Sequence, residues 1–412
     1  MPKLISIFIL LCFSLNAEPL KIWISSQQDK IYYENMIQHY KAKVDPNFNA
    51  VVEAFGFREM PDKLGIALKS GVGAPDICQL DEVLYGLYLQ GEIPFVDLTE
   101  RVKKANLDKT ILKQRLDLFS WQGKNYGLPQ SVSAYVLYYR KDLFKELKID
   151  VKELETWKGV EALGKKLSKD GQGLMAIDPT LFGVYMRQRG VPMFSEKGEL
   201  FPDMKKAVET MTWIKKMCDD GTFVSPSRGS MFDPVFFNGA VENGEVLVLP
   251  GADWFGLDMI QQFLPHQEGK WGILPLPKWH DSKLRTASFA GQGLLITKAS
   301  KKQDEAWKFM HFVMTDKKAN IERFTNGNSF PAYMPAWDEK ELQAKSDFFG
   351  GESLGKLMKE LGPTIPKVNM CPQRPMAIFM LQENYFSAIL YGTYTPEQAF
   401  KEMQLNLKRQ QE

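Results

Sequence analysis

Acidic, amide and aromatic side chains recur in this sequence close to the points where β-strands are expected to end or begin. The residues that share this position are Ser26, Gln27, Gln28, Asp81, Glu82, Gln130, Ser133, Asp178, Asp253, Trp254 and Gln292. In α/β sheets, ligands bind beyond the carboxyl ends of the strands. Carboxylates and amides hydrogen-bond to hydroxyl groups, and an indole ring covers an apolar ligand face. The pattern therefore predicts a binding site for a polar, hydroxyl-rich molecule.

Several of these candidates also have a purely structural interpretation. Asp81 can be a helix N-cap, because an aspartate side chain there accepts backbone N–H bonds, and Asp178 can be a turn residue before Pro179. Trp254 can belong to the core, although the preceding loop at residues 251–253 favours exposure in a cleft. Gln292 lies between two glycines, which indicates a close approach of the backbone to another group. Both interpretations stay open for each residue.

No arrangement of catalytic or metal-binding residues accompanies the candidates. Residues 351–355 (GESLG) fit G-x-S-x-G, but that motif needs a preceding strand, and residues 348–350 are typical of a loop. The four histidines lie far apart and match no zinc motif; we expect His39 and His311 to be structural helix residues. A glycoside hydrolase is the main enzymatic alternative, since it needs only two carboxylates around the scissile bond. We predict no catalytic residues, no metal and no cofactor.

The elements that position the first candidates alternate regularly. Residues 20–24 and 50–55 are expected strands, and residues 33–40 have the apolar spacing of a helix between them. A third strand is expected at 74–80, followed by a helix from 81 to 90. This alternation predicts an α/β fold with a largely parallel sheet.

Glycine and proline punctuation then marks a change in the pattern near residue 129, before an expected strand at 134–139. The middle of the chain is helix-rich, at 156–167 and 204–218, with short strands at 246–249 and 271–274. A second change falls at 275–277, and a strand follows at 291–296. The tail is expected to be helical at 302–314, 376–390 and 396–407. We expect Trp23 to be a core residue and Arg374 to lie on the surface.

Five stretches, in this order, resemble the extracellular solute-binding proteins of ABC sugar importers, in particular the maltose-binding-protein-like group. They are residues 73–77 (GAPDI), 121–129 (WQGKNYGLP), 138–144 (YYRKDLF), 155–157 (ETW) and 299–312, which contains EAWKF. Residues 138–144 match the family pattern at every position. Residues 155–157 lack the usual proline and the acidic residue that follows. Residues 330–333 (FPAY) and 348–351 (FFGG) resemble a subgroup associated with arabinose and arabino-oligosaccharides.

The resemblance implies a two-lobed periplasmic-binding-protein fold, with hinge crossings between the lobes and a ligand cleft that closes over the sugar. One lobe is expected at 18–130 and 278–330, and the other at 131–277 and 331–412. By family position the candidate residues lie in ligand-contacting loops, although Gln130 and Ser133 stand where the maltose-binding group has an acidic contact. This difference implies a sugar other than the one that the maltose-binding group binds, or a sugar with fewer charged contacts.

By the same resemblance, the expected function is a sugar receptor that delivers its ligand to the permease subunits of an importer in the inner membrane. We expect a monomer without enzymatic activity. The alternatives from other classes are a secreted carbohydrate hydrolase and a receptor for a peptide or polyamine. The spread of acids, amides and aromatic residues favours a sugar. A net charge of +2 over 412 residues gives no indication of nucleic-acid binding.

The N-terminus indicates export. Met1, Pro2 and Lys3 precede an apolar run at 4–13, which is shorter than the roughly 20 residues of a membrane span, and Ala17 precedes Glu18. We predict a signal peptide at 1–17 and a periplasmic protein; a lipid anchor at Cys12 is disfavoured because no small residue precedes it. The cysteines that follow, at 78, 218 and 371, are expected to be buried free thiols, although one disulfide is possible from the sequence alone.

Overall fold

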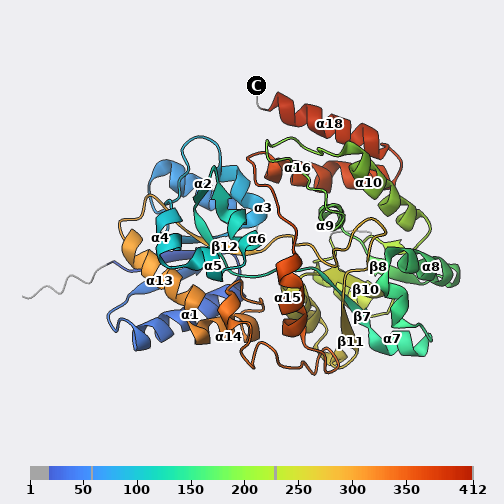
Figure 1. Ribbon diagram of the computed structural model, residues 1–412, viewed down its shortest axis with the longest axis horizontal. Helices are drawn as coiled ribbons and strands as arrows, with labels where there is room; N and C mark the ends of the chain where they lie inside the picture. Colours follow the sequence, from blue (N-terminus) through green and yellow to red (C-terminus); the bar gives the residue numbers. More distant parts are fainter. Residues whose placement is uncertain (1–17, 57–58, 227–229, 411–412) are drawn as a thin grey trace, which may run out of the picture.

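Two β-sheets, each flanked by helices, form the two lobes of the protein (Figure 1). The computed structural model describes residues 18–56, 59–226 and 230–410. The predicted signal peptide, its cleavage after Ala17 and the question of an anchor at Cys12 therefore lie outside the described residues. An α/β architecture is confirmed.

The first sheet has five strands. In spatial order they are β2 (Ala50–Ala54), β1 (Leu20–Ile24), β3 (Ile77–Asp81), β12 (Gln292–Ile296) and β6 (Gly127–Pro129). β1 is parallel to β2 and β3, whereas β12 runs antiparallel to β3 and β6. Gln292 consequently pairs with Asp81, and Gly293 pairs with Pro129. The ends of β3 and β6 and the beginning of β12 thus share one edge of the sheet.

The second sheet also has five strands. Their spatial order is β11 (Trp271–Pro275), β7 (Val136–Arg140), β10 (Val246–Gly251), β8 (Gly173–Ala176) and β9 (Phe223–Val224). Val136, at the beginning of β7, pairs with Gly251 and Pro275, the last residues of β10 and β11. β8 is parallel to β10, so its carboxyl end lies at the same edge. A separate hairpin consists of β4 (Ser120–Trp121) and β5 (Lys124–Asn125).

Helices cover both sheets. Around the first sheet they are α1 (Gln27–Lys43), α2 (Glu59–Ser70), α3 (Glu82–Tyr85), α4 (Thr99–Lys104), α5 (Leu107–Thr110), α6 (Lys113–Leu116), α13 (Gln303–Thr315) and α14 (Lys317–Thr325). Around the second they are α7 (Lys141–Glu146), α8 (Trp157–Leu167), α9 (Thr180–Gln188), α10 (Met204–Asp219), α11 (Pro234–Phe236), α12 (Gln261–Phe263), α15 (Leu354–Leu361), α16 (Arg374–Met380), α17 (Phe386–Leu390) and α18 (Pro396–Arg409). Figure 1 shows α13 and α14 beside α1, although α1 is far from both helices in the sequence.

Short 3-10 and π-helical segments connect these elements. They are η1 (Gly86–Tyr88), η2 (Asp117–Phe119), η3 (Val151–Glu155), η4 (Ser168–Asp170), η5 (Phe237–Val241), η6 (Phe255–Ile260), η7 (Pro265–Gln267), η8 (Met334–Ala336), η9 (Gly362–Thr364) and η10 (Leu381–Tyr385). Two of them correct the expected helices. The helix expected at 81–90 is reduced to α3 and η1, and the helix expected at 376–390 is interrupted by the π-helical η10.

Local sequence explains why the predicted helices form where they do. The Thr156 hydroxyl accepts a hydrogen bond from the backbone N–H of Gly159 (3.0 Å), so α8 begins with a side-chain N-cap. Its buried face then packs against the second sheet, and Trp157 meets the rings of Tyr185 and Trp213 at centroid distances of 4.8 and 5.2 Å. Burial of this apolar stripe holds the helix in place.

The chain crosses between the sheets at 130–135, at 276–291 and after α14. These crossings lie side by side, because isolated β-bridges join Ser131 to Pro331 and Ala134 to Ser288. Ser133 and Ala290 have left-handed backbone angles, with φ of 50° and 60°. The crossings bring together the sheet edges described above. The exact lobe boundaries, which we expected at 130, 277 and 330, stay a prediction.

Candidate ligand-binding site between the two sheets

The predicted site residues lie on the two sheet edges that the crossings join, or on the crossings themselves. The first sheet contributes residues after β1, β3 and β6 and at the beginning of β12. The second contributes residues after β8 and β10. Interactions between these residues and three arginines that the sequence did not single out determine the chemistry of the region.

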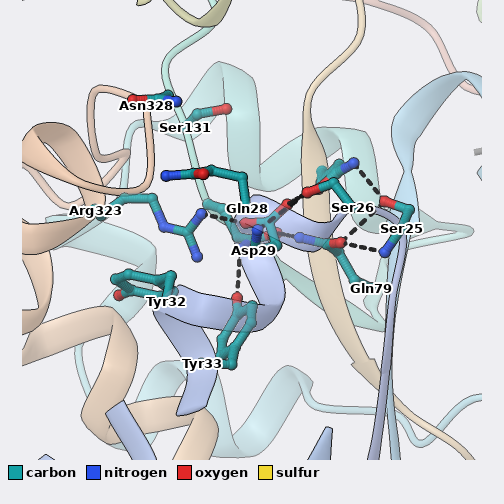
Figure 2. A network of polar contacts seen from close by, with 12 residues as sticks. Ser25, Ser26, Gln28, Asp29, Tyr32, Tyr33, Gln79, Ser131, Arg323 and Asn328 are labelled. Carbon is teal, nitrogen blue, oxygen red and sulfur yellow. Dashed lines mark hydrogen bonds and ion pairs between the residues drawn. The ribbon is translucent and has the colours of Figure 1, made fainter. Parts of the chain in front are cut away.

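An amide network occupies the edge of the first sheet. The side-chain oxygen of Gln79 accepts hydrogen bonds from the backbone N–H (2.8 Å) and the hydroxyl (2.9 Å) of Ser25. Its amide nitrogen donates to Gln130 Oε1 at 3.0 Å, and Gln130 Nε2 donates to the Tyr33 hydroxyl. Gln292 Nε2 donates to Ser25 Oγ at 2.6 Å. Two of the predicted residues, Gln130 and Gln292, are therefore held in fixed orientations through shared partners. Figure 2 shows Ser25 and Gln79 of this network, with Tyr33 below them.

A buried ion pair lies next to this network, at the beginning of α1. Arg323 Nη1 contacts Asp29 Oδ1 at 2.6 Å, and the guanidinium carbon lies 3.7 Å from the centre of the Tyr32 ring (Figure 2). Ser26 Oγ is 3.0 Å from both the backbone nitrogen and Oδ2 of Asp29. Ser26 is thus the N-cap of α1, and its hydroxyl fixes the carboxylate that binds Arg323.

Three other predicted residues have different surroundings. Gln27 is exposed, whereas Gln28 is half-buried and its Nε2 donates to the backbone carbonyl of Asn326. Ser133 is fully buried in the first crossing, with its hydroxyl 2.8 Å from that of Ser131. In this arrangement Gln28 links α1 to the chain segment after α14, and Ser133 stabilises a strained backbone turn.

Asp81 has the capping role that was one of its two interpretations. Its Oδ1 accepts a hydrogen bond from the backbone N–H of Val83 (2.8 Å), and its Oδ2 accepts one from Gly291 (3.2 Å). Burial raises the pKa of Asp81 to about 7, and the neighbouring Glu82 carboxylate adds to this shift. The carboxyl group therefore connects β3 and α3 to the second crossing.

Glu82 forms an ion pair between the two lobes. Arg374 Nη1 lies 2.5 Å from Glu82 Oε2, and both side chains are almost fully buried. Glu82 Oε1 also accepts hydrogen bonds from the backbone N–H of Ala290 (3.0 Å) and from Arg374 Nη2 (3.1 Å). The expected surface position of Arg374 is wrong, because α16 packs on α3 and a Cβ at Gly86 would lie 2.6 Å from the Pro375 ring.

The carboxylates of the second lobe are also buried. Asp178 Oδ1 accepts a hydrogen bond from Thr180 N (3.0 Å), and its Oδ2 accepts one from the Ser230 hydroxyl (2.9 Å). Asp253 is completely buried, and its Oδ2 accepts a hydrogen bond from Phe330 N at 2.7 Å. Burial raises the pKa of Asp178, and it raises the pKa of Asp253 to about 6.

Trp254 follows Asp253 and is half-buried. Its ring lies 5.9 Å from that of Phe232 and 6.1 Å from that of Phe255, centre to centre. It therefore packs at the margin of the second core and also retains an accessible surface. Gln292, between Gly291 and Gly293, has the close backbone approach that its glycines indicated. A Cβ at Gly291 would be 2.1 Å from an Arg115 nitrogen.

Sequence reasoning missed Arg115, Thr180, Arg187 and the Arg323 described above. Arg115 is completely buried on α6, and it donates from Nε to the Ser131 carbonyl and from Nη2 to the Ala290 carbonyl, both at 2.9 Å. Thr180 and Arg187 lie on α9, which begins just after Asp178. Thr180 was detectable from its place beside a predicted site residue. Nothing in the local sequence distinguishes Arg115 or Arg187 from surface arginines.

Unpaired polar atoms concentrate in this region. Buried side-chain atoms without a hydrogen-bond partner among the described residues include Arg115 Nη1, Thr180 Oγ1, Arg187 Nε and Nη2, Asp253 Oδ1, Trp254 Nε1 and Arg323 Nη2. Away from the site, Asn125, Asp220 and Glu341 have one such atom each. An unsatisfied buried polar group costs about 1–3 kcal/mol. Each such group needs a partner, which water, an ion or a ligand can supply, and most of these groups lie at the facing edges of the two sheets.

The alternative chemistries find little support in the geometry. Ser353 of the G-x-S-x-G match caps α15: its hydroxyl accepts from Lys356 N (3.2 Å) and donates to the Gln343 carbonyl (3.0 Å), and a turn rather than a strand precedes it.

No group of three or more potential metal ligands occurs within residues 18–56, 59–226 and 230–410. Cys78, Cys218 and Cys371 are free thiols. Among the described helices, none is long and apolar enough to cross a bilayer.

Two α/β lobes, joined by crossing segments, thus carry polar side chains on the sheet edges that face each other. The family model "Bacterial extracellular solute-binding protein" matches residues 25–320, and the chain belongs to this family. The resemblance stated from the sequence is thereby confirmed, as is the two-lobed fold.

Individual relatives are distant but extend over nearly the whole chain. Arabinooligosaccharide-binding proteins of Halalkalibacterium halodurans and Bacillus subtilis are each 26% identical, over 94% and 95% of this chain and 88% and 92% of their own. A solute-binding protein of Thermotoga lettingae, solved with α-D-tagatose, has a TM-score of 0.78 at 18% identity and covers 95% of this chain and 99% of its own. A Listeria monocytogenes protein solved with cycloalternan has a TM-score of 0.76 at 22% identity, over 95% and 98%.

Proposed function

We propose that the protein binds a sugar, either a monosaccharide or an oligosaccharide, between its lobes and delivers it to the permease subunits of an ABC importer. The observation that carries the proposal is the set of unpaired buried atoms at the facing sheet edges. The set includes donors on Arg115, Arg187 and Trp254 and an acceptor on Asp253. A sugar hydroxyl donates and accepts at once, so one class of ligand group satisfies both kinds.

An aromatic surface supports the same class of ligand. Trp254 is half-buried beside the unpaired Asp253 oxygen and can cover the apolar face of a pyranose or furanose ring. The relatives named above are described as arabinooligosaccharide-binding proteins, and a further one from Rhizobium radiobacter, 26% identical over 81% of this chain, is described as lactose-binding. An oligosaccharide is accordingly the ligand we favour.

The proposed contacts combine the residues predicted from the sequence with those that the fold adds. The former are Ser26, Gln27, Gln28, Asp81, Glu82, Gln130, Ser133, Asp178, Asp253, Trp254 and Gln292. Arg115, Thr180 and Arg187 join them. A sugar that contacts both lobes stabilises the closed arrangement, and closure creates the surface that the permease recognises.

The protein acts as a receptor rather than as an enzyme in this proposal. The main support is that the one serine in a hydrolase-like motif is a helix cap. We further propose that the exported protein works in the periplasm as a monomer, beginning near Glu18 after removal of residues 1–17, and needs no cofactor. Mass spectrometry of the exported protein tests the cleavage site; an acylated Cys12 would contradict it.

The first experiment is a thermal-shift and calorimetric screen of the protein from Glu18 onward against arabinose, xylose, maltose and their oligomers, with chromatography of the sugars afterwards. A ligand that binds only the native state raises the melting temperature. Saturable binding with intact sugar supports the proposal. Cleavage products would establish the hydrolase instead. Binding of peptides or polyamines and of no sugar would refute the proposed ligand class.

A further inference from the structure

Arg187 is a buried cation whose hydrogen-bonding capacity is almost unused. Its side chain is 3% exposed, and neither Nε nor Nη2 has a hydrogen-bond partner in the described part of the chain. Other buried arginines all have carboxylate or carbonyl partners: Arg115, Arg140, Arg189, Arg323 and Arg374. The guanidinium carbon of Arg187 lies over the Phe289 ring, 5.7 Å from its centre. This contact compensates little of the cost of burying a charge.

Nearby carboxylates are committed to other donors. Glu82 binds Arg374 and the backbone of Ala290. Asp178 binds a backbone N–H and the Ser230 hydroxyl. Asp81 accepts hydrogen bonds from two backbone N–H groups. Asp253 accepts one from the backbone N–H of Phe330. Among the described residues, none of these carboxylates forms an ion pair with Arg187, although the charge of Glu82 acts on it from a distance.

Burial and the surrounding charges both act on the pKa of Arg187. Burial lowers the pKa of Arg187 to about 10, and the positive charge of Arg374 contributes to the shift. Glu82 and Tyr135 act in the opposite direction, and Arg115 again lowers the pKa. An anion placed against Arg187 would reverse the effect of burial and stabilise the charged guanidinium.

The helix that carries Arg187 presents a face suited to such an anion. Thr180, Gly183 and Arg187 are spaced three and four residues apart, so they lie on one face of α9. The Thr180 hydroxyl oxygen is buried and unpaired among the described residues, like the two Arg187 nitrogens. A Cβ at Gly183 would lie 3.3 Å from both Arg187 Nη1 and Met193 Sδ, so the missing side chain at this position lets the guanidinium lie close to α9.

We propose that Arg187 binds the carboxylate of an acidic sugar, so that the ligand is a uronate or an oligosaccharide that carries one. This inference rests on the proposed sugar-binding function and makes its ligand class more specific. The planar guanidinium matches a carboxylate with two parallel hydrogen bonds, and ionic hydrogen bonds of this kind are stronger than neutral ones. Thr180 donates to the same group or to an adjacent ring hydroxyl.

Calorimetric titration of the protein from Glu18 onward with matched pairs of sugars tests the proposal. The probes are xylotriose and xylotriose substituted with glucuronic acid, galactotriose and trigalacturonate, and arabinotriose as a further neutral sugar. We expect an acidic member to bind about 10- to 100-fold more tightly than its neutral counterpart, as two charge-assisted hydrogen bonds imply. Arg187→Gln should abolish most of this preference, because it should weaken the binding of the acidic sugars much more than that of their neutral counterparts.

Arg189→Gln is the matched control. Arg189 lies one residue beyond α9 and is equally buried, but its guanidinium binds Asp281 and Thr210 away from the unpaired atoms. This variant should lower the melting temperature and retain the preference for the acidic sugar. Arg187→Lys keeps the positive charge but loses the planar guanidinium, so it should retain part of the preference. The variant also checks that the site still folds.

The outcomes separate this inference from the function on which it rests. Tighter binding of a neutral sugar than of its acidic partner, or a preference unchanged in Arg187→Gln, overturns the carboxylate site and leaves the sugar receptor standing. If none of the five sugars binds, the uronate inference is overturned. The wider sugar screen then shows whether the protein is a sugar receptor at all.

Discussion

Replacing Arg374 with glutamine should weaken ligand binding by disfavouring lobe closure. Arg374 lies on α16, packed on α3, and its guanidinium contacts Glu82 at 2.5 Å with both side chains almost fully buried. The variant leaves the Glu82 carboxylate with the single backbone N–H of Ala290 as donor. Separation of the lobes at the contact between α3 and α16 would return Glu82 to water, and the penalty would then fall on the closed arrangement.

The magnitude follows from the burial of the pair. Removing one partner of a buried ion pair costs about 3–5 kcal/mol when the other charge stays buried. The Ala290 bond reduces this cost, and we take about 1.4–2.8 kcal/mol as the part that opposes closure. Each 1.4 kcal/mol is tenfold in affinity. The dissociation constant of Arg374→Gln for the sugar found in the screen should therefore rise about 10- to 100-fold.

A double-mutant cycle distinguishes this mechanism from direct contact with the ligand. Glu82→Gln combined with Arg374→Gln replaces the pair with two neutral amides and should recover about tenfold of the lost affinity. Arg140→Gln is the control, because Arg140 is equally buried but binds Asp142 within the second lobe. It should lower the urea midpoint and leave the dissociation constant unchanged. An affinity of Arg374→Gln within twofold of the parent, or a coupling below about 0.5 kcal/mol, would refute the reasoning.

Three further predictions concern the site and its support. Trp254→Ala should weaken sugar binding about 10- to 100-fold without unfolding the protein. Trp307→Ala, in the first lobe, should leave sugar binding unchanged. Calorimetry measures the affinity of each variant, and circular dichroism checks that it is folded. The raised pKa of Asp81, about 7, means that the folded state binds a proton more tightly than the unfolded chain, so stability should fall from about pH 4 to 7, and Asp81→Asn should flatten this part of the melting profile. Gly291→Ala should cost at least about 1–3 kcal/mol in urea unfolding, because its φ is 108° and the new Cβ would lie 2.1 Å from an Arg115 nitrogen; a loss below 0.5 kcal/mol would contradict this.

The sheet elements were predictable because their signals are local. β1 and β2 begin at the predicted residues, and β12 begins one residue later than expected, since apolar runs bounded by glycine and proline determine them. The order of these elements also carried the family resemblance. The helix expected at 81–90 was wrong in length, because the Pro375 ring packs against Gly86 and the chain bends into η1.

The candidate site was only partly predictable, for a physical reason. The rule that ligands bind beyond strand ends selects Asp81 and Asp253, whose place depends on neighbouring residues in the chain. It cannot select Arg374, because its burial depends on Glu82, 292 residues away in the sequence. Arg187 is likewise an ordinary helix residue until the second crossing brings Phe289 over its guanidinium.

The second crossing links ligand binding to lobe movement. The Ala290 N–H donates to Glu82, its carbonyl accepts from Arg115, and Gly291 donates to Asp81. Rotation of one lobe must move this segment, since residues 276–291 join the two sheets. The same movement would change the surroundings of the interlobe ion pair and of Arg115, whose Nη1 has no partner among the described residues. Under the proposed function, a ligand that satisfies that nitrogen would stabilise the crossing in the conformation that holds Glu82 against Arg374, and binding and closure would then share the same hydrogen bonds.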